Sequence, residues 1–302
     1  MHIVSKAALA AAAFLAPLAP SAAAPAKPAA EAAAPTRFTV TVEGAGPDVI
    51  LIPGLSSPRE VWAGTVAALR GDYRLHLVQL NGFGGTPAGA NAAGDILPGT
   101  IAELRRYIEA NHLRRPALVG HSMGGLLALM LAEAAPDQVG RVMAVDALPF
   151  IGSLFDPAAT AASLAPQAAA MRDMMATPAT DEQRAAGAAR VAAGLAKTPA
   201  ARDLVARWIV ASDPKISGEA VYEDMTTDVR PGLGKIAAPV RVVYAWDVTS
   251  VPEARAKALF EGAYAGTPHV SFAPVEGSYH FVMLDQPERF QAALRAFLAE
   301  KP

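Results

Sequence analysis

Hydrophobic residues recur along the chain in short runs that alternate with longer amphipathic stretches. The segment 48–54, DVILIPG, is a continuous apolar run ending in Pro-Gly, as expected for a strand buried on both faces. The segment 37–44, RFTVTVEG, instead alternates apolar and polar residues, which is typical of a half-buried antiparallel edge strand. Further strands are predicted at 73–80, 116–120, 141–147, 239–245 and 269–275.

Segments with a helical period lie between these strands. In the segment 99–112, Ile101, Leu104 and Ile108 fall on one face of a helix. Other helices are predicted over 58–70, over 124–135, from about residue 252, and over 287–300. The alternation of strand and helix implies right-handed crossovers, and therefore an α/β fold with a mostly parallel, twisted sheet and helices on both faces.

The alternation stops between residues 148 and 234, where the sequence is helical and rich in alanine. We interpret 148–234 as a helical cap inserted into a core formed by 37–147 and 235–302. Prolines interrupt the insertion at Pro157, Pro178, Pro199 and Pro214.

The N-terminus has the pattern of an export signal. Lys6 provides a positive charge, and residues 7–18 form an apolar stretch too short to span a bilayer. Small residues at Ser21 and Ala23 predict cleavage after about Ala23, which makes 1–23 a signal peptide and 24–36 a flexible linker. We therefore expect an exported protein, periplasmic or secreted; an alanine-rich tail without that function is the alternative interpretation.

Composition narrows the classes of function. The 302-residue chain is 52% hydrophobic and has a net charge of −2 without a basic stripe, so no nucleic-acid partner is expected. It has no cysteine, which excludes disulfides, thiolate catalysis and cysteine-ligated zinc.

The glycine-rich loop 81–89 matches no nucleotide-binding pattern, and we expect neither a metal nor a cofactor. No segment after the signal predicts stable membrane insertion, because Glu133 and Pro136 interrupt the longest apolar run.

A serine lies between glycines in Gly120-His121-Ser122-Met123-Gly124, which fits the Gly-x-Ser-x-Gly pattern of a nucleophile elbow. A predicted strand ends directly before the pattern and a predicted helix follows it, which is the context that the elbow requires. Ser122 is thus the candidate nucleophile, and the backbone N–H of Met123 is a candidate oxyanion donor. The simpler alternative is a small residue in a structural turn.

With this strand–elbow–helix arrangement, the chain resembles the α/β-hydrolase fold family, in its lid-bearing, esterase-like branch of serine hydrolases, from about residue 38 to 300. The resemblance implies a Ser-His-Asp triad in the chain order serine, acid, histidine. His280, in the stretch EGSYHFVMLDQPERF, stands where the family places its base. His121 is adjacent to Ser122, but we interpret it as an elbow residue that packs or forms hydrogen bonds locally.

Two aspartates are candidates for the acid of the triad. Asp247 follows the strand at 239–245, where the resemblance places the acid, although the chain has Ala245-Trp246-Asp247 where the family commonly has Gly-x-x-Asp. Asp146, which ends the strand at 141–147, is the alternative. Asp247 is preferred. Asp224, Asp228 and Arg230 are interpreted as a structural charge cluster where the cap rejoins the core.

The second oxyanion donor is expected in the segment IPGLSSPREVW. Pro53 stands where the family often has histidine, Gly54 keeps the turn, and Leu55 would present its backbone N–H. An ordinary strand-to-helix loop is the alternative interpretation.

Methionines in the predicted cap suggest an adaptable apolar substrate pocket, with core packing as the alternative. The expected pocket residues are Met171, Met174, Met175 and Phe150. The predicted activity is hydrolysis of small, mainly apolar carboxylic esters through an acyl-enzyme. Lactonase, amidase or aminopeptidase, thioesterase, and acyltransferase or perhydrolase chemistry use the same triad, and a non-catalytic ligand-binding homologue is the alternative from another class.

Overall fold

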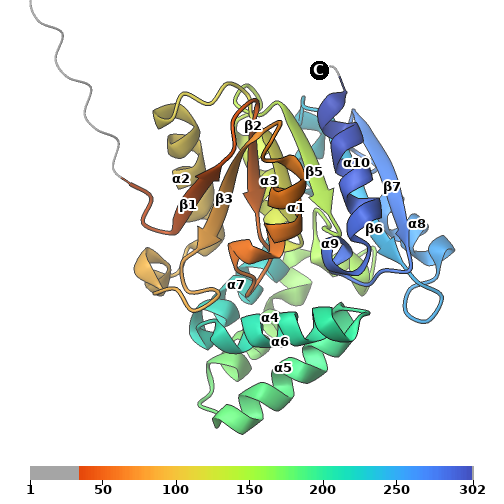
Figure 1. Cartoon of the computed structure of the whole chain (residues 1–302). Coiled ribbons are helices and arrows are strands. Elements are labelled where there is room, and N and C mark those ends of the chain that lie inside the picture. The colour runs from red at the N-terminus through yellow and green to blue at the C-terminus, as the bar shows by residue number, and fades with distance from the viewer. Residues whose placement is uncertain (1–33, 301–302) are drawn as a thin grey trace, which may run out of the picture. The chain divides into compact units, whose positions relative to one another are not determined.

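The structure, a computed structural model, describes residues 34–300 (Figure 1). Within them, seven strands form one sheet in the order β1-β3-β2-β4-β5-β6-β7. Only the edge pair β1–β3 is antiparallel, and the remaining neighbours are parallel. The α/β fold class with a mostly parallel sheet is therefore confirmed. The predicted signal peptide, 1–23, lies outside the described residues, as does most of the predicted linker.

The strands follow the apolar runs of the sequence. Their bounds are β1 Phe38–Glu43, β2 Asp48–Ile52, β3 Arg74–Leu80, β4 Ala117–His121, β5 Arg141–Val145, β6 Val240–Trp246 and β7 Val270–Glu276. The helices outside the segment between β5 and β6 are α1 Ala63–Leu69, α2 Ile96–Ala110, α3 Met123–Ala134, α8 Glu253–Ala263, α9 Val282–Asp285 and α10 Pro287–Ala299. Short 3-10 turns lie at η1 Arg59–Trp62, η2 Gly89–Ala93, η3 Ile151–Leu154 and η4 Arg230–Lys235.

The sheet is covered on both faces (Figure 1). Successive residues of β2 point to opposite sides, so Ile50 and Ile52 join one apolar cluster while Val49 and Leu51 join the other. Helices α2, α3 and α8 pack on the first side, and α1 and α10 pack on the second. All four of these β2 residues are at most 1% exposed, which explains why the strand reads as an unbroken apolar run.

Four helices lie between β5 and β6, near the carboxyl ends of the parallel strands (Figure 1). They are α4 Ala161–Ala176, α5 Asp181–Leu195, α6 Pro199–Ala211 and α7 Pro214–Thr226, called here the four-helix segment. Helix α4 packs on α7, and α5 packs on α6. Pro199 and Pro214 begin helices rather than break them, because a missing N–H costs nothing in the first turn.

The four-helix segment is attached to the core at several loops, including the loop after β3, where the N–H of Asp213 donates to the carbonyl of Gly82 at 2.8 Å. The hydroxyl of Ser217 on α7 lies 2.9 Å from that of Ser56, in the loop after β2. The turn between α5 and α6 contacts the loop after β7: the N–H of Phe281 donates to the carbonyl of Leu195 at 3.2 Å. The carboxylate of Asp285 also accepts from the backbone N–H of Lys197 at 3.0 Å. Ser212, the residue after α6, also donates its hydroxyl proton to the carbonyl of Ser56 at 3.2 Å, so the loop of Ser56 contacts both pairs of helices.

A further contact joins α7 to the start of α2. Asp95, the residue before α2, makes no side-chain capping bond. The carboxylate of Glu223 on α7 instead accepts from the N–H groups of Ile96 and Leu97 at 2.8 and 2.7 Å. Pro98 has no N–H to satisfy, so Glu223 completes the hydrogen bonding of this helix terminus from another element.

Replacing Glu223 with alanine is expected to lower the free energy of unfolding by about 1 to 2 kcal/mol, because two buried N–H groups lose their acceptor. Glu219→Ala on the same helix is the matched control, since its contact with Arg172 is 4.0 Å long and partly exposed. Urea unfolding of the two variants checks the expectation. Equal stability of both variants would contradict the capping role.

Candidate active site

Ser122 occupies a sharp turn between β4 and α3. Its backbone has φ 54° and ψ −127°, a conformation that a residue with a side chain rarely adopts. The turn is fixed at both ends: the N–H of Ser122 donates to the carbonyl of Val145 at 3.0 Å, and its carbonyl accepts from Gly125 at 2.7 Å. A strained serine held between a strand and a helix is the geometry of a nucleophile elbow.

The glycines of the elbow are required by close backbone contacts. A Cβ atom on Gly120 would lie 2.1 Å from the carbonyl oxygen of Gly124. A Cβ atom on Gly124 would in turn lie 2.3 Å from the carbonyl oxygen of Ile52, at the end of β2. Strand β4, helix α3 and strand β2 therefore approach one another more closely than any side chain permits.

His280 lies in the loop between β7 and α9, and its partner is Asp146. Nδ1 of His280 and Oδ2 of Asp146 are 2.7 Å apart. The other carboxylate oxygen of Asp146 accepts from the N–H of Ala245 at 2.9 Å. Because a carboxylate accepts, Nδ1 of His280 carries a proton, and the lone pair of Nε2 is left free as a base.

Asp247 does not contact His280. Its carboxylate forms an ion pair with Lys197 and accepts from the hydroxyl and the N–H of Thr249. These bonds, the one from Lys197 first, lower the pKa of Asp247 to about 2. The sequence-based preference is thus corrected: the carboxylate on His280 belongs to Asp146, the alternative acid, while Asp247 joins β6 to the four-helix segment.

His121 links the elbow to the His280 loop. Nε2 of His121 donates to the carbonyl oxygen of His280 at 3.0 Å, and the two imidazole rings lie 4.6 Å apart between centroids. Burial, followed by repulsion from His280, lowers the pKa of His121 well below its usual value. His121 is therefore neutral and holds His280 beside the elbow.

Within the described residues Ser122 Oγ forms no hydrogen bond; in unliganded active sites the serine–histidine bond is often long.

Two backbone N–H groups are positioned beside Ser122. Met123 begins α3, so its N–H has no acceptor within the helix. Gly54 passes against the elbow, where an added Cβ would lie 2.9 Å from Cβ of Ser122, and this brings the following Leu55 to the site. Among the described residues, the N–H of Leu55 donates to no protein group. This arrangement can hold a negatively charged oxygen, as predicted for an oxyanion hole.

The four predicted pocket residues do not lie together. Met171 and Met175 pack in a cluster with Leu55 and with Val221 of α7. Met174 is 67% exposed and does not join this cluster, which corrects its assignment to the apolar pocket. Phe150 is fully buried in a separate cluster and lies under the guanidinium of Arg230, a placement that favours a structural role.

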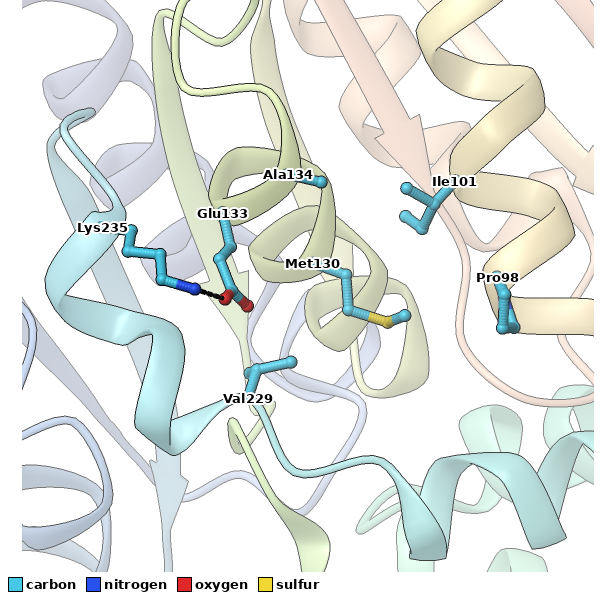
Figure 2. A pocket seen from close by; sticks show the side chains of 7 residues that line it. All are labelled: Pro98, Ile101, Met130, Glu133, Ala134, Val229 and Lys235. Atoms are coloured by element: carbon cyan, nitrogen blue, oxygen red, sulfur yellow. Dashed lines mark hydrogen bonds and ion pairs between the residues drawn. The ribbon is translucent and has the colours of Figure 1, made fainter.

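A surface groove lies elsewhere, between α2, α3 and η4. Figure 2 shows this groove, with a volume of about 450 Å³. Its lining residues are Pro98, Ile101, Met130, Glu133, Ala134, Val229 and Lys235. An ion pair of 3.0 Å joins Lys235 to Glu133, and Met130 stands about 12 Å along α3 from Ser122. The groove is thus distinct from the candidate active site.

Among residues 34–300, no helix has the length and apolar character needed to cross a membrane.

Sequence comparisons identify relatives over part of the chain. The chain is 38% identical over 117 residues to a pimeloyl-[acyl-carrier protein] methyl ester esterase from Aeromonas hydrophila, and 33% identical over 116 residues to the esterase of the same name from Vibrio atlanticus. These alignments cover 37% and 38% of this chain. The chain spans 42% of the length of each of these two relatives.

Solved structures share the fold over most of the chain. A bromoperoxidase from Bacillus anthracis matches with a TM-score of 0.71 at 20% identity, covering 87% of this chain and 95% of that one. An enol-lactonase from Burkholderia xenovorans matches with a TM-score of 0.70 at 18% identity, covering 87% and 96%. Residues 49–293 match the family described as the Alpha/beta hydrolase family. The chain, with its parallel sheet, serine elbow and His280 loop, therefore belongs to the alpha/beta hydrolase family.

Proposed function

We propose that the protein is a serine hydrolase that cleaves small carboxylic esters. The observation that carries the proposal is the 2.7 Å contact between Asp146 and Nδ1 of His280, beside a strained serine elbow. A histidine oriented by a carboxylate and left with a free Nε2 is suited to deprotonate a serine hydroxyl. The partial relatives named as methyl ester esterases support the choice of an ester over an amide.

The proposed reaction proceeds in two halves. Oγ of Ser122 attacks the ester carbonyl while Nε2 of His280 takes the hydroxyl proton, and the N–H groups of Met123 and Leu55 stabilise the oxyanion. The C–O bond to the alcohol then breaks, and His280 returns the proton to the departing alkoxide. A water molecule, deprotonated by His280, attacks the acyl-enzyme and releases the acid and Ser122. Asp146 keeps the imidazole in the required tautomer throughout.

The four-helix segment is proposed to act as a cap over the substrate. Its attachments reach the oxyanion loop, through Ser217 and Ser56, and the base loop, through Asp285 and Lys197. Met171 and Met175, which pack against the same cluster as Leu55, supply apolar surface near the proposed oxyanion donor. Flexible thioethers at this position favour apolar acyl groups of more than one shape.

Labelling with a fluorophosphonate probe tests the proposed nucleophile. The folded protein is expected to take up one probe per chain, on Ser122, and Ser122→Ala is expected to take up none. A panel of ethyl esters, thioesters, lactones and amides of matched acyl length then defines the reaction, with the esters turned over fastest. Absence of a label on Ser122 would favour a non-catalytic, ligand-binding protein, and faster turnover of another class would replace the ester assignment.

We also infer that the protein is exported. The support is the sequence of residues 1–23, with its basic start, short apolar stretch and small residues before the expected cleavage site. The protein isolated from its native cells is expected to begin near Ala24, in the periplasmic or secreted fraction. N-terminal sequencing checks this, and a mature chain that still begins at Met1 would overturn the inference.

A further inference from the structure

Asp224 on α7 differs from the other acidic residues around it. Glu223 accepts from the start of α2, Asp228 pairs with Arg230 at 2.7 Å, and Glu219 faces Arg172. Asp224, within the described part of the chain, has neither a hydrogen bond nor an ion pair. The sequence-based interpretation of Asp224, Asp228 and Arg230 as one structural charge cluster is therefore correct for the last two only.

Asp224 shares a face of α7 with two residues that approach the proposed oxyanion loop. Ser217, Val221 and Asp224 are spaced by four and three residues, so they fall within about 60° on one face of α7. Ser217 meets Ser56 on this face, and Val221 packs in the cluster that includes Leu55. The Asp224 carboxylate is also close enough to His280 for the two to attract each other. Asp224 therefore lies on the face of α7 that contacts the proposed oxyanion loop.

Neighbouring elements provide no charge that would neutralise Asp224. On α4, Arg172 bonds Asp173 at 3.0 Å and lies over the ring of Tyr222. The start of α2 is held by Glu223, and η3 has no charged residue. Among residues 34–300, His280 is the one titratable group that acts on Asp224. Burial raises the pKa of Asp224 to about 7, and the attraction to His280 opposes this rise.

A partly buried carboxylate without a protein partner is available to bind a group of opposite charge. We propose that Asp224 is a specificity-determining residue that binds a positively charged ammonium group on the substrate and repels a carboxylate at the same place. This inference rests on the proposed ester hydrolysis and names a class of substrate for it. The favoured substrates are esters whose acyl or alcohol part carries a primary amine a few bonds from the reacting carbonyl.

The test compares three ethyl esters of equal chain length: one ending in an ammonium group, one in a methyl group and one in a carboxylate. The series is repeated at several lengths, because the distance between Asp224 and the bound carbonyl sets the best spacing. In the wild-type enzyme at pH 8, kcat/KM for the best ammonium ester is expected to exceed that for its carboxylate analogue by about 10-fold or more. In Asp224→Asn, which keeps the side-chain shape, the ratio is expected to approach 1.

The matched control is Glu219→Gln, which removes an acid from the same helix outside the site and is expected to retain the wild-type ratio.

The pH dependence of the ammonium-to-carboxylate ratio supplies a second readout. Below pH 7 Asp224 becomes protonated, so the ammonium-to-carboxylate ratio should fall, whereas the substrate amine, with a pKa of about 10, stays charged.

The outcomes separate the two proposals. If no ester is cleaved and Ser122 takes up no fluorophosphonate, the proposed function fails. If esters are cleaved but the wild-type ratio is near 1, or if Asp224→Asn keeps the wild-type ratio, the assignment of Asp224 is overturned while ester hydrolysis stands. A ratio that is lost in Asp224→Asn and retained in Glu219→Gln supports the charge-selecting role.

Discussion

Asp146→Asn is expected to lower kcat/KM for ester hydrolysis by about 10⁴-fold. One oxygen of the Asp146 carboxylate accepts from the N–H of Ala245, so the oxygen of an asparagine amide would keep that bond and turn its NH₂ group toward His280. His280 would then have to accept at Nδ1 and carry its proton on Nε2, where it cannot deprotonate Ser122. Steady-state kinetics on an ethyl ester measure the loss. Asparagine also tolerates the positive φ of 45° at this position, so the backbone should be unaffected.

Asp247→Asn is the matched control, because it makes the same change at the end of the neighbouring strand. It removes an ion pair to Lys197, whose side chain is 41% exposed, and activity is expected to remain within about 3-fold of the wild type. A loss in Asp247→Asn as large as that in Asp146→Asn would contradict the assignment of the acid. So would an Asp146→Asn enzyme that keeps most of its activity.

Gly124→Ala is expected to lower the free energy of unfolding by about 3 kcal/mol, near the upper end for overpacking. The added methyl group would lie 2.3 Å from the carbonyl oxygen of Ile52 and 2.5 Å from that of Pro53. Both obstacles are backbone atoms, so the clash is relieved only by moving α3 away from the end of β2. The same displacement shifts Leu55 from Ser122, and kcat should fall together with stability.

Gly187→Ala in α5 is the matched helical control, since nothing lies within 4 Å of an added Cβ there. Alanine is the better helix former, so this variant is expected to gain about 0.5 to 1 kcal/mol. Urea unfolding of the two variants, with unchanged m-values, measures both effects. Equal responses at Gly124 and Gly187 would show that the contact between α3 and β2 can relax.

The sequence predicts the sheet and the elbow well because their signals are local. A strand such as β2 is buried on both faces and therefore apolar throughout, and the glycines around Ser122 mark a turn without room for side chains. His280 is identified through the resemblance to the family, which places the base in the loop after the last strand. The apolar run of β2 reflects the helices that cover both faces of a parallel sheet, and the glycines of the elbow are close neighbours of Ser122 in the sequence.

The acid could not be chosen from the sequence because both aspartates follow parallel strands and emerge at the same edge of the sheet. Which of them reaches His280 depends on the path of the loop after β7 and on Lys197, which comes from the four-helix segment and engages Asp247. The one available signal was the departure from the family pattern at Ala245-Trp246-Asp247. The absence of the usual glycine before Asp247 indicated that this strand end has a different role.

The four-helix segment was predictable as helical but not in its contacts. Met171 and Met174 stand three residues apart on α4, yet the first packs against the core and the second is 67% exposed. Alanine fills so much of both faces that the sequence marks no clear buried stripe. The lack of a partner for Asp224 was equally hidden, because Asp228 and Arg230 nearby suggested a shared ion-pair network.

The attachments of the four-helix segment to the core have a consequence for how the chain tolerates insertions. Helix α7 and Ser212, the residue after α6, are held at the loop of Ser56, and the turn between α5 and α6 is held at the loop of His280. The connector 177–179 between α4 and α5 takes part in neither attachment. Extra residues placed there would lengthen the path between the pairs and leave both anchors intact. This connector is therefore the position at which a peptide tag or a larger substrate-recognition loop can be added to the segment.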